Sequence, residues 1–109
     1  MTQHPPIYMV YSTFADRKEA IAISKRLLES KLIACANIID NMASVYQWNS
    51  EIQEEKEVLL LAKTTEDKVP SAIAFITTHH SYELPCVMAY RAEAGNPSYL
   101  EWVAAQTQD

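Results

Sequence analysis

The amino-acid sequence predicts a single α+β domain of the ferredoxin-like class (βαββαβ), in which helices cover one face of a four-stranded antiparallel sheet. The hydrophobic pattern changes along the chain in the order strand, helix, strand, strand, helix, strand, helix. A tight turn joins the two middle strands into a hairpin, and each strand–helix–strand unit favours a right-handed connection. The chain has 109 residues, 49% of them hydrophobic, which suffices for one packed core over residues 1–109.

The first strand is the run Ile7–Tyr11, which has the composition of a buried strand. A helix follows, because Asp16 is suited to cap its amino terminus and Glu19 completes a pattern similar to a capping box. Small and apolar residues then recur at helical spacing and predict one face packed on the sheet: Ala20, Ile23, Ser24, Leu27 and Leu28.

The middle of the chain predicts two long strands joined by a tight turn. Residues 32–39 form an apolar run that ends at the polar pair 40–41, and residues 43–48 continue in strand-like alternation. The turn is placed at 49–51, and the return strand runs over about 52–64. Strands this long form an extended hairpin that projects beyond a small domain, and a lone two-stranded ribbon is marginal in water. The hairpin therefore predicts a partner that covers it.

The remainder of the chain predicts a second helix, a fourth strand and a C-terminal helix. Pro70 is tolerated only in a first helical turn, so the second helix begins near Asp67 or Lys68. Residues 86–90 form the fourth strand, and the asparagine–proline pair at 96–97 starts the last helix. The apolar residues of the two helices are Val69, Ala72, Ile73 and Ile76, and then Leu100, Trp102 and Val103.

Composition excludes several classes of function. A net charge of -5 argues against a general nucleic-acid binder, which needs surplus Lys and Arg. The single glycine, Gly95, excludes phosphate-binding loops that require two or more. The amino-terminal residues lack the basic and apolar regions of a secretory signal, and no apolar stretch is long enough to span a membrane. We therefore expect a cytoplasmic protein with reduced thiols.

His79 and His80 are the candidate metal ligands. Imidazole is the commonest metal ligand in proteins, and paired histidines suit Cu(II) or Zn(II). Adjacent side chains diverge by about 100° on a helix and face opposite sides of a strand. Both therefore reach one ion only from an irregular turn or across a subunit boundary. The alternative is that both lie in the last turn of a helix, where the macrodipole favours them.

The two cysteines are not spaced as a CxxC pair and do not build a zinc site by themselves. Cys35 lies in an apolar run, where a free cysteine usually acts as a small buried hydrophobe. Cys86 opens a strand and, together with His80, would form a Cys/His nucleophile. The sequence supplies no third group to orient that histidine, so we expect no enzyme activity.

Charged residues gather on the hairpin and on the first helix. Alternation sends neighbouring carboxylates of the hairpin to opposite faces, and we interpret them as solvated charges on an exposed ribbon: Glu51, Glu54, Glu55 and Glu57. The basic residues of the first helix are interrupted by acidic ones and indicate a mixed solvated surface. RNA binding in this fold class needs a glycine- and aromatic-rich strand signature, which this sequence lacks.

The hairpin also carries two aromatic residues, Tyr46 and Trp48. Burial within one compact chain is hard to arrange there, and exposed paired aromatics usually mark an interface. Tyr99 and Trp102 on the last helix either serve the same contact or pack on the sheet.

Five segments of the chain together resemble the CutA family of divalent-cation tolerance proteins. The resemblance extends from about Met9 to Val103, in the family's order and spacing. It rests on Leu32–Ile38, Ser44–Trp48, Glu57–Thr65, His80–Pro85 and Gly95–Trp102. It implies a ferredoxin-like subunit that forms a tight homotrimer by edge-strand pairing of the long hairpins. Such a fold and assembly are similar to those of the PII signal-transduction proteins.

The resemblance also implies binding of Cu(II) or a similar heavy-metal ion. In some members the proposed ligands are a His-His pair, which corresponds to His79 and His80, and a cysteine at the end of the first strand. Ser12 occupies that cysteine position, and a hydroxyl is a poor copper ligand. Ser81 stands where the family usually has proline, a change expected to loosen the turn that orients His80.

These observations leave two functions open. The first is a homotrimeric cytoplasmic protein of metal tolerance that binds Cu2+ through His79 and His80 and catalyses nothing. The second is a PII-like regulatory trimer that binds a small anionic ligand or a protein in clefts between subunits. Lys63, Tyr82 and Glu83 would line such a cleft by their place in the family motifs. Neither function involves nucleic acid or a membrane.

Overall fold

A computed structural model describes residues 4–109, and its elements follow the predicted order. The strands are β1 (Ile7–Phe14), β2 (Cys35–Trp48), β3 (Glu51–Thr65) and β4 (Val87–Arg91). The helices are α1 (Arg17–Glu29), the 3-10 helix η1 (Glu66–Lys68), α2 (Val69–His79) and α3 (Pro97–Gln106). No helix within residues 4–109 is long and apolar enough to cross a bilayer. Residues 1–3, part of the segment examined for a targeting signal, lie outside the described residues.

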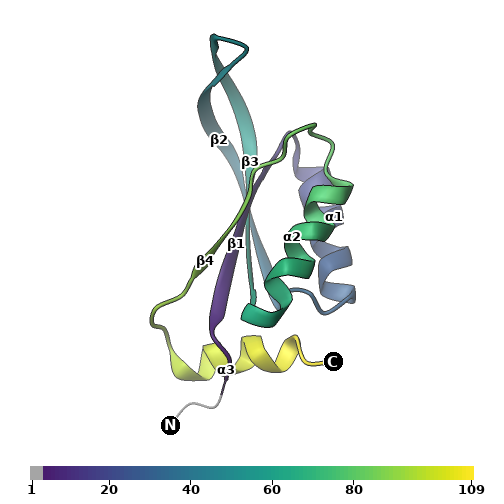
Figure 1. Cartoon of the computed structure of the whole chain (residues 1–109), viewed down its shortest axis with the longest axis vertical. Coiled ribbons are helices and arrows are strands. Elements are labelled where there is room, and N and C mark those ends of the chain that lie inside the picture. The colour runs from purple at the N-terminus through teal and green to yellow at the C-terminus, as the bar shows by residue number, and fades with distance from the viewer. Residues whose placement is uncertain (1–3) are drawn as a thin grey trace.

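The strands form an antiparallel sheet in the order β2-β3-β1-β4. Each βαβ unit thus has a strand of the other unit inserted between its own two strands, which is the ferredoxin-like arrangement. Helices α1 and α2 cover one face of the sheet, and α3 crosses the end opposite to the hairpin tip (Figure 1). The predicted fold class is confirmed.

The main core lies between the sheet and helices α1 and α2. Its largest fully buried side chains include Phe14 on β1, Leu27 on α1, Leu60 on β3 and Ile76 on α2. Burial of each such side chain contributes about 1.5–3 kcal/mol. A second cluster under α3 joins Ile7, Ala34 and Val103. On the face of the sheet opposite α1 and α2, the large side chains of Ile39, Met88 and Tyr90 are exposed.

The amino terminus of α1 forms only half of the predicted capping box. Asp16 Oδ1 accepts a hydrogen bond from the Glu19 backbone N–H at 2.8 Å, as expected. The Glu19 carboxylate instead accepts hydrogen bonds from the backbone N–H and the Oγ of Ser81, both at 2.8 Å. Glu19 therefore links α1 to the segment that follows α2.

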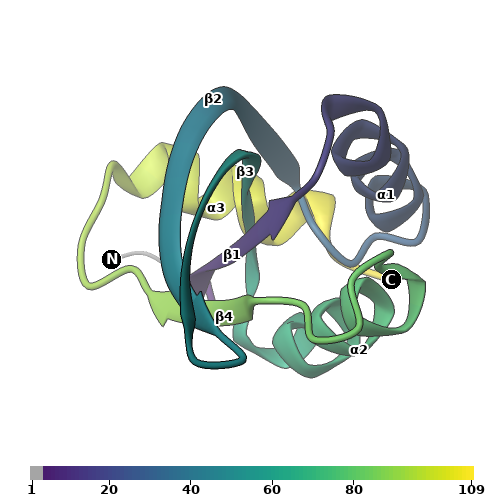
Figure 2. The same cartoon turned by 90° about the horizontal axis from the view of Figure 1, so that it is seen from above.

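The β2–β3 hairpin gives the molecule its elongated shape, with extents of 51 × 26 × 21 Å. Strand β2 continues through the polar pair at 40–41 by means of a register shift between Ile39 and Met42, where Asn41 has a φ of 60°. The tip is a two-residue turn, in which Asn49 and Ser50 have φ values of 51° and 67°. Viewed from above, the hairpin curves across the sheet (Figure 2).

Candidate functional site

His79 lies at the carboxyl end of α2, with its ring exposed and stacked on Phe75 at a centroid distance of 4.2 Å. Its Nδ1 is 2.9 Å from the Phe75 carbonyl oxygen, an acceptor, so Nδ1 carries the proton. Nε2 then presents its lone pair, and the Arg26 Nη2 lies 3.4 Å from it. A cation approaching this lone pair therefore meets a guanidinium.

His80 follows α2 in extended conformation and turns into the protein. Its side chain is fully buried and stacks on Phe14 at 4.4 Å. Nε2 lies 2.8 Å from the Thr13 carbonyl oxygen, and Nδ1 accepts from the Tyr82 backbone N–H at 3.0 Å. Since a carbonyl only accepts and an N–H only donates, the ring is the neutral Nε2–H tautomer. Both of its nitrogens are engaged.

The donor set implied by the family resemblance does not fit a metal ion in this conformation. The two imidazoles contact different neighbours, and His80 has no free lone pair. Ser12 is fully buried, and its Oγ donates to the Cys86 carbonyl oxygen at 2.7 Å. Nowhere in residues 4–109 do three His, Cys, Asp or Glu side chains form a group that could hold a metal ion. Joint binding by His79 and His80 stays a prediction, and it requires Tyr82 to release Nδ1.

Ser81 does not loosen the turn after α2, contrary to the expectation. Its backbone N–H and Oγ both donate to the Glu19 carboxylate. The Glu19 carboxylate therefore holds the segment through the backbone N–H of Ser81. A proline at this position would lack that N–H.

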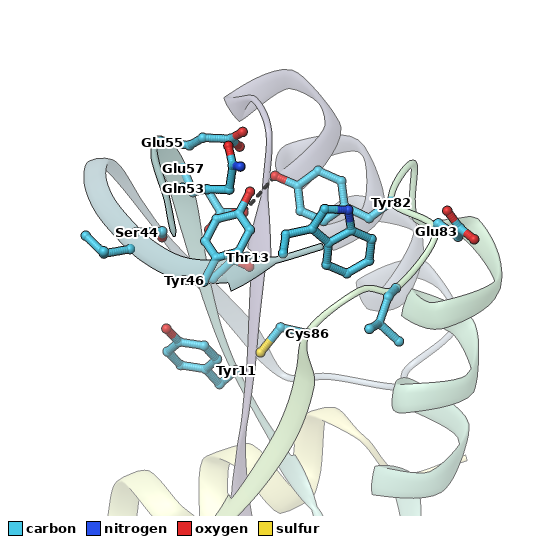
Figure 3. Close-up of a pocket in the computed structure, with 13 residues that line it drawn as sticks. Tyr11, Thr13, Ser44, Tyr46, Gln53, Glu55, Glu57, Tyr82, Glu83 and Cys86 are labelled. Carbon is cyan, nitrogen blue, oxygen red and sulfur yellow. Dashed lines mark hydrogen bonds between the residues drawn. The ribbon is translucent and has the colours of Figure 1, made fainter. Parts of the chain in front are cut away.

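A cavity with a volume of about 820 Å³ lies between the curved hairpin and the segment before β4. Figure 3 shows the side chains that converge on it from four parts of the chain. They are Tyr11 and Thr13 from β1; Ser44, Val45, Tyr46 and Trp48 from β2; Gln53, Glu55 and Glu57 from β3; and Tyr82, Glu83, Leu84 and Cys86 from the last segment.

A hydrogen bond closes one wall of this cavity. The Tyr82 hydroxyl donates to Glu57 Oε2 at 2.7 Å, which joins the segment after α2 to β3 (Figure 3). Burial and this hydrogen bond raise the pKa of Tyr82 far above its usual value of 10. Burial first, and then the Glu55 carboxylate, raises the pKa of Tyr46. Both phenols therefore stay neutral at physiological pH.

The residues predicted to line a ligand cleft are only partly brought together. Tyr82 and Glu83 line the cavity, whereas Lys63 lies elsewhere and donates to Asn37 Oδ1. Among the described lining residues there are carboxylates and no Lys, Arg or His. This charge disfavours the small anionic ligand of the regulatory interpretation.

The two free cysteines occupy different environments. Burial and the nearby Glu57 carboxylate raise the pKa of the Cys86 thiol, so it is protonated at neutral pH. His80 is hydrogen-bonded to Thr13 and Tyr82, and neither of its nitrogens serves as a base for that thiol. Cys35 is half-buried rather than enclosed, with its Sγ 3.2 Å from the Tyr99 hydroxyl.

Sequence reasoning missed the role of the hairpin carboxylates in this cavity. Glu57 is half-buried and accepts a hydrogen bond from Tyr82, whereas the sequence pattern predicts a solvated charge there. The signal was available in the alternation, because Glu55 pairs with Ser44 and Gln53 pairs with Tyr46. These residues therefore share one face of the hairpin. The alternation does not predict that the segment containing Tyr82 lies across this face.

The fold and the cavity together define a class of small ferredoxin-like proteins whose β2–β3 hairpin extends well beyond the domain. Two solved structures have the same fold, CutA1 from Oryza sativa and the divalent ion tolerance protein CutA1 from Ehrlichia chaffeensis. The TM-scores are 0.93 and 0.91, at 31% and 36% identity. The alignments cover 97% of both chains for the first, and 98% of this chain and 99% of the other for the second.

The family model described as CutA1 divalent ion tolerance protein matches residues 8–106. The chain therefore belongs to the CutA1 divalent ion tolerance family, which confirms the resemblance carried by the five sequence segments. Protein CutA of Mus musculus is 38% identical over 98 residues, 90% of this chain and 55% of the mouse protein. The divalent-cation tolerance protein CutA of Thermus thermophilus is 35% identical over 99 residues, 91% of this chain and 96% of the relative. The chain thus spans about half the length of the mouse relative.

Proposed function

We propose that this chain acts in tolerance of divalent cations as a homotrimer that binds Cu(II) or a similar heavy-metal ion through His79 and His80. The family match over residues 8–106 is the observation that supports a function in tolerance. The proposal includes no catalysis, since the pKa of the Cys86 thiol is raised and His80 has no free nitrogen.

The homotrimer is supported by an unpaired edge and an uncovered apolar surface. Pairing of β1 with β3 ends at Phe14 and Val58, so residues 51–57 of β3 pair only with β2. Unpaired strand edges are templates for pairing with another chain. Exposed apolar side chains follow the hairpin and β4: Ile39, Val45, Tyr46, Trp48, Ile52, Met88 and Tyr90.

The metal part of the proposal is supported by the family and by the exposed imidazole of His79. Its Nε2 lone pair is accessible once Arg26, 3.4 Å away, moves aside. Participation of His80 requires a further change, namely loss of its hydrogen bond from the Tyr82 N–H.

A cytoplasmic location is proposed with the function. Two free thiols, Cys35 and Cys86, suit a reducing compartment. The periplasmic divalent cation tolerance protein CutA of Archaeoglobus fulgidus has the same fold, so the location of this chain is tested separately by cell fractionation, and we expect the chain in the cytoplasmic fraction.

The oligomeric state is tested by light scattering during size-exclusion chromatography. We expect a mass three times the 12.4 kDa of the chain. Val45 and Ile52 are 65% and 80% exposed, so Val45→Asp/Ile52→Asp places charges on the hairpin without disturbing the core, and the mass should fall to that of one chain. Leu28→Asp makes the same kind of change on α1 as a control and should leave the trimer intact. A single-chain mass for the unmodified protein would contradict the assembly.

Copper binding is tested by titrating the reduced protein with Cu(II) near pH 7. His79→Ala removes one imidazole ligand, and its affinity for Cu(II) should be about tenfold or more weaker than that of the unmodified protein. His4→Ala removes another imidazole and should leave the affinity unchanged. Equal affinities of the unmodified protein and His79→Ala would contradict a role of His79.

A further inference from the structure

We propose that Tyr82 is a positioning residue that keeps the lone pair of His80 occupied, and that Glu57 on the hairpin holds Tyr82 in place. Two hydrogen bonds of Tyr82 carry the inference. Its backbone N–H donates to His80 Nδ1 at 3.0 Å, and its hydroxyl donates to Glu57 Oε2 at 2.7 Å. The inference deepens the proposed function, on which its metal part rests, because it names what regulates the second imidazole.

Nδ1 is the nitrogen of His80 that displacement of Tyr82 makes available. Nε2 carries the proton and lies 2.8 Å from the Thr13 carbonyl oxygen, so it has no lone pair to offer. Glu19 Oε2 lies 3.9 Å from Nδ1. Once the Tyr82 N–H moves away, a basic lone pair stands beside a carboxylate, and this pair of groups attracts a cation.

The imidazole of His80 has contacts that a displacement of Tyr82 leaves intact. The side chain is fully buried and stacks on Phe14, with the ring planes 10° apart. Rotation of the imidazole would break this stacking and the hydrogen bond to Thr13 together. Displacement of Tyr82 breaks neither of them. Release of Nδ1 therefore proceeds through Tyr82 rather than through the ring itself.

Glu57 determines how readily Tyr82 is displaced. It is half-buried on β3, and its carboxylate is a charged acceptor, which makes the hydrogen bond from the phenol stronger than one between neutral groups. Burial and this hydrogen bond raise the pKa of Tyr82, so the hydroxyl keeps its proton throughout the physiological range. Figure 3 shows the bond linking the segment after α2 to β3.

The segment that contains Tyr82 is attached to two separate elements. The Ser81 N–H and Oγ donate to Glu19 on α1, whereas the Tyr82 hydroxyl donates to Glu57 on the hairpin. Loss of the Glu57 contact frees Tyr82 while Ser81 stays bound. A movement of the hairpin relative to α1 therefore changes the availability of His80, which couples the two parts of the molecule.

The first test uses the metal-free protein and follows amide hydrogen exchange at position 82 by NMR. Tyr82→Phe keeps the ring that lies 4.7 Å from the His80 ring and removes only the hydroxyl. We expect exchange to become about tenfold or more faster, because a hydrogen bond to a charged acceptor is lost. Tyr99→Phe is the matched control, since its hydroxyl lies 3.2 Å from Cys35 Sγ on another part of the fold, and it should leave this rate unchanged.

The second test is a Cu(II) titration of the same variants. Tyr82→Phe does not change the charge of the protein, and it should bind Cu(II) about tenfold more tightly as the state with a free Nδ1 becomes more populated. Tyr99→Phe should bind like the unmodified protein. Equal affinities of the unmodified protein and Tyr82→Phe would overturn the regulation of His80, even where His79→Ala still shows that metal binds.

Glu57→Ala is the second variant, because it removes the acceptor and leaves Tyr82 itself unchanged. Exchange at position 82 should again accelerate, whereas Glu54→Ala, at an exposed position of the same strand, should have no effect. Unchanged exchange in both Tyr82→Phe and Glu57→Ala would overturn the proposal. Absence of Cu(II) binding in every variant would contradict the proposed function, and accelerated exchange would then still support the role of Tyr82 in holding His80.

Discussion

The imidazole of His80 is held by one acceptor, the Thr13 carbonyl, and one donor, the Tyr82 N–H. Phe14 and Tyr82 flank the ring, with centroid distances of 4.4 Å and 4.7 Å. A ring so enclosed contributes to stability through contacts that a metal ion would have to break. His79, one residue earlier, is exposed, so its ring is expected to contribute less to the free energy of unfolding.

We therefore expect His80→Ala to lower the free energy of unfolding by about 2–4 kcal/mol, because it leaves a cavity and two unpaired backbone groups. His79→Ala should change it by less than about 1 kcal/mol, since it removes an exposed stacking contact. Urea denaturation followed by circular dichroism measures both. Equal effects of the two substitutions would show that the buried contacts of His80 contribute no more stability than the exposed stacking of His79.

At the scale of elements, the strands and helices follow from the sequence with small shifts at their ends. Period-two alternation and the turn residues locate the hairpin, and Pro70 and the pair at 96–97 locate the starts of α2 and α3. The polar pair at 40–41 predicts the end of an apolar run, whereas the structure shows a bulge there that lets β2 continue.

The cavity lay beyond such reasoning for a physical reason. Local patterns determine which face of a strand a side chain occupies, but contacts between distant segments depend on sheet twist and packing. Glu57 and Tyr82 are 25 residues apart, and Glu19 and Ser81 are 62 apart. The capping-box pattern was incomplete for the same reason. The Glu19 carboxylate accepts a hydrogen bond from the distant Ser81 N–H and not from the neighbouring Asp16 N–H.

For the whole molecule, contacts within a single chain do not account for the stability of the projecting hairpin. It projects along the 51 Å axis, and the segment that contains Tyr82 contacts it through the hydrogen bond to Glu57. The rest of its surface carries exposed apolar residues, Val45 and Ile52 among them. Assembly would bury this surface and stabilise a ribbon that is marginal alone.

This dependence predicts how thermal stability varies with protein concentration. If folding is linked to formation of a trimer, a hundredfold increase in concentration stabilises each chain by about 2 kcal/mol. The melting temperature should then rise by roughly 5 °C or more. The Val45→Asp/Ile52→Asp protein lacks the linkage, so its melting temperature should not vary with concentration. Differential scanning calorimetry at two concentrations measures this. A constant melting temperature for the unmodified protein would mean that each chain folds and melts independently of its neighbours.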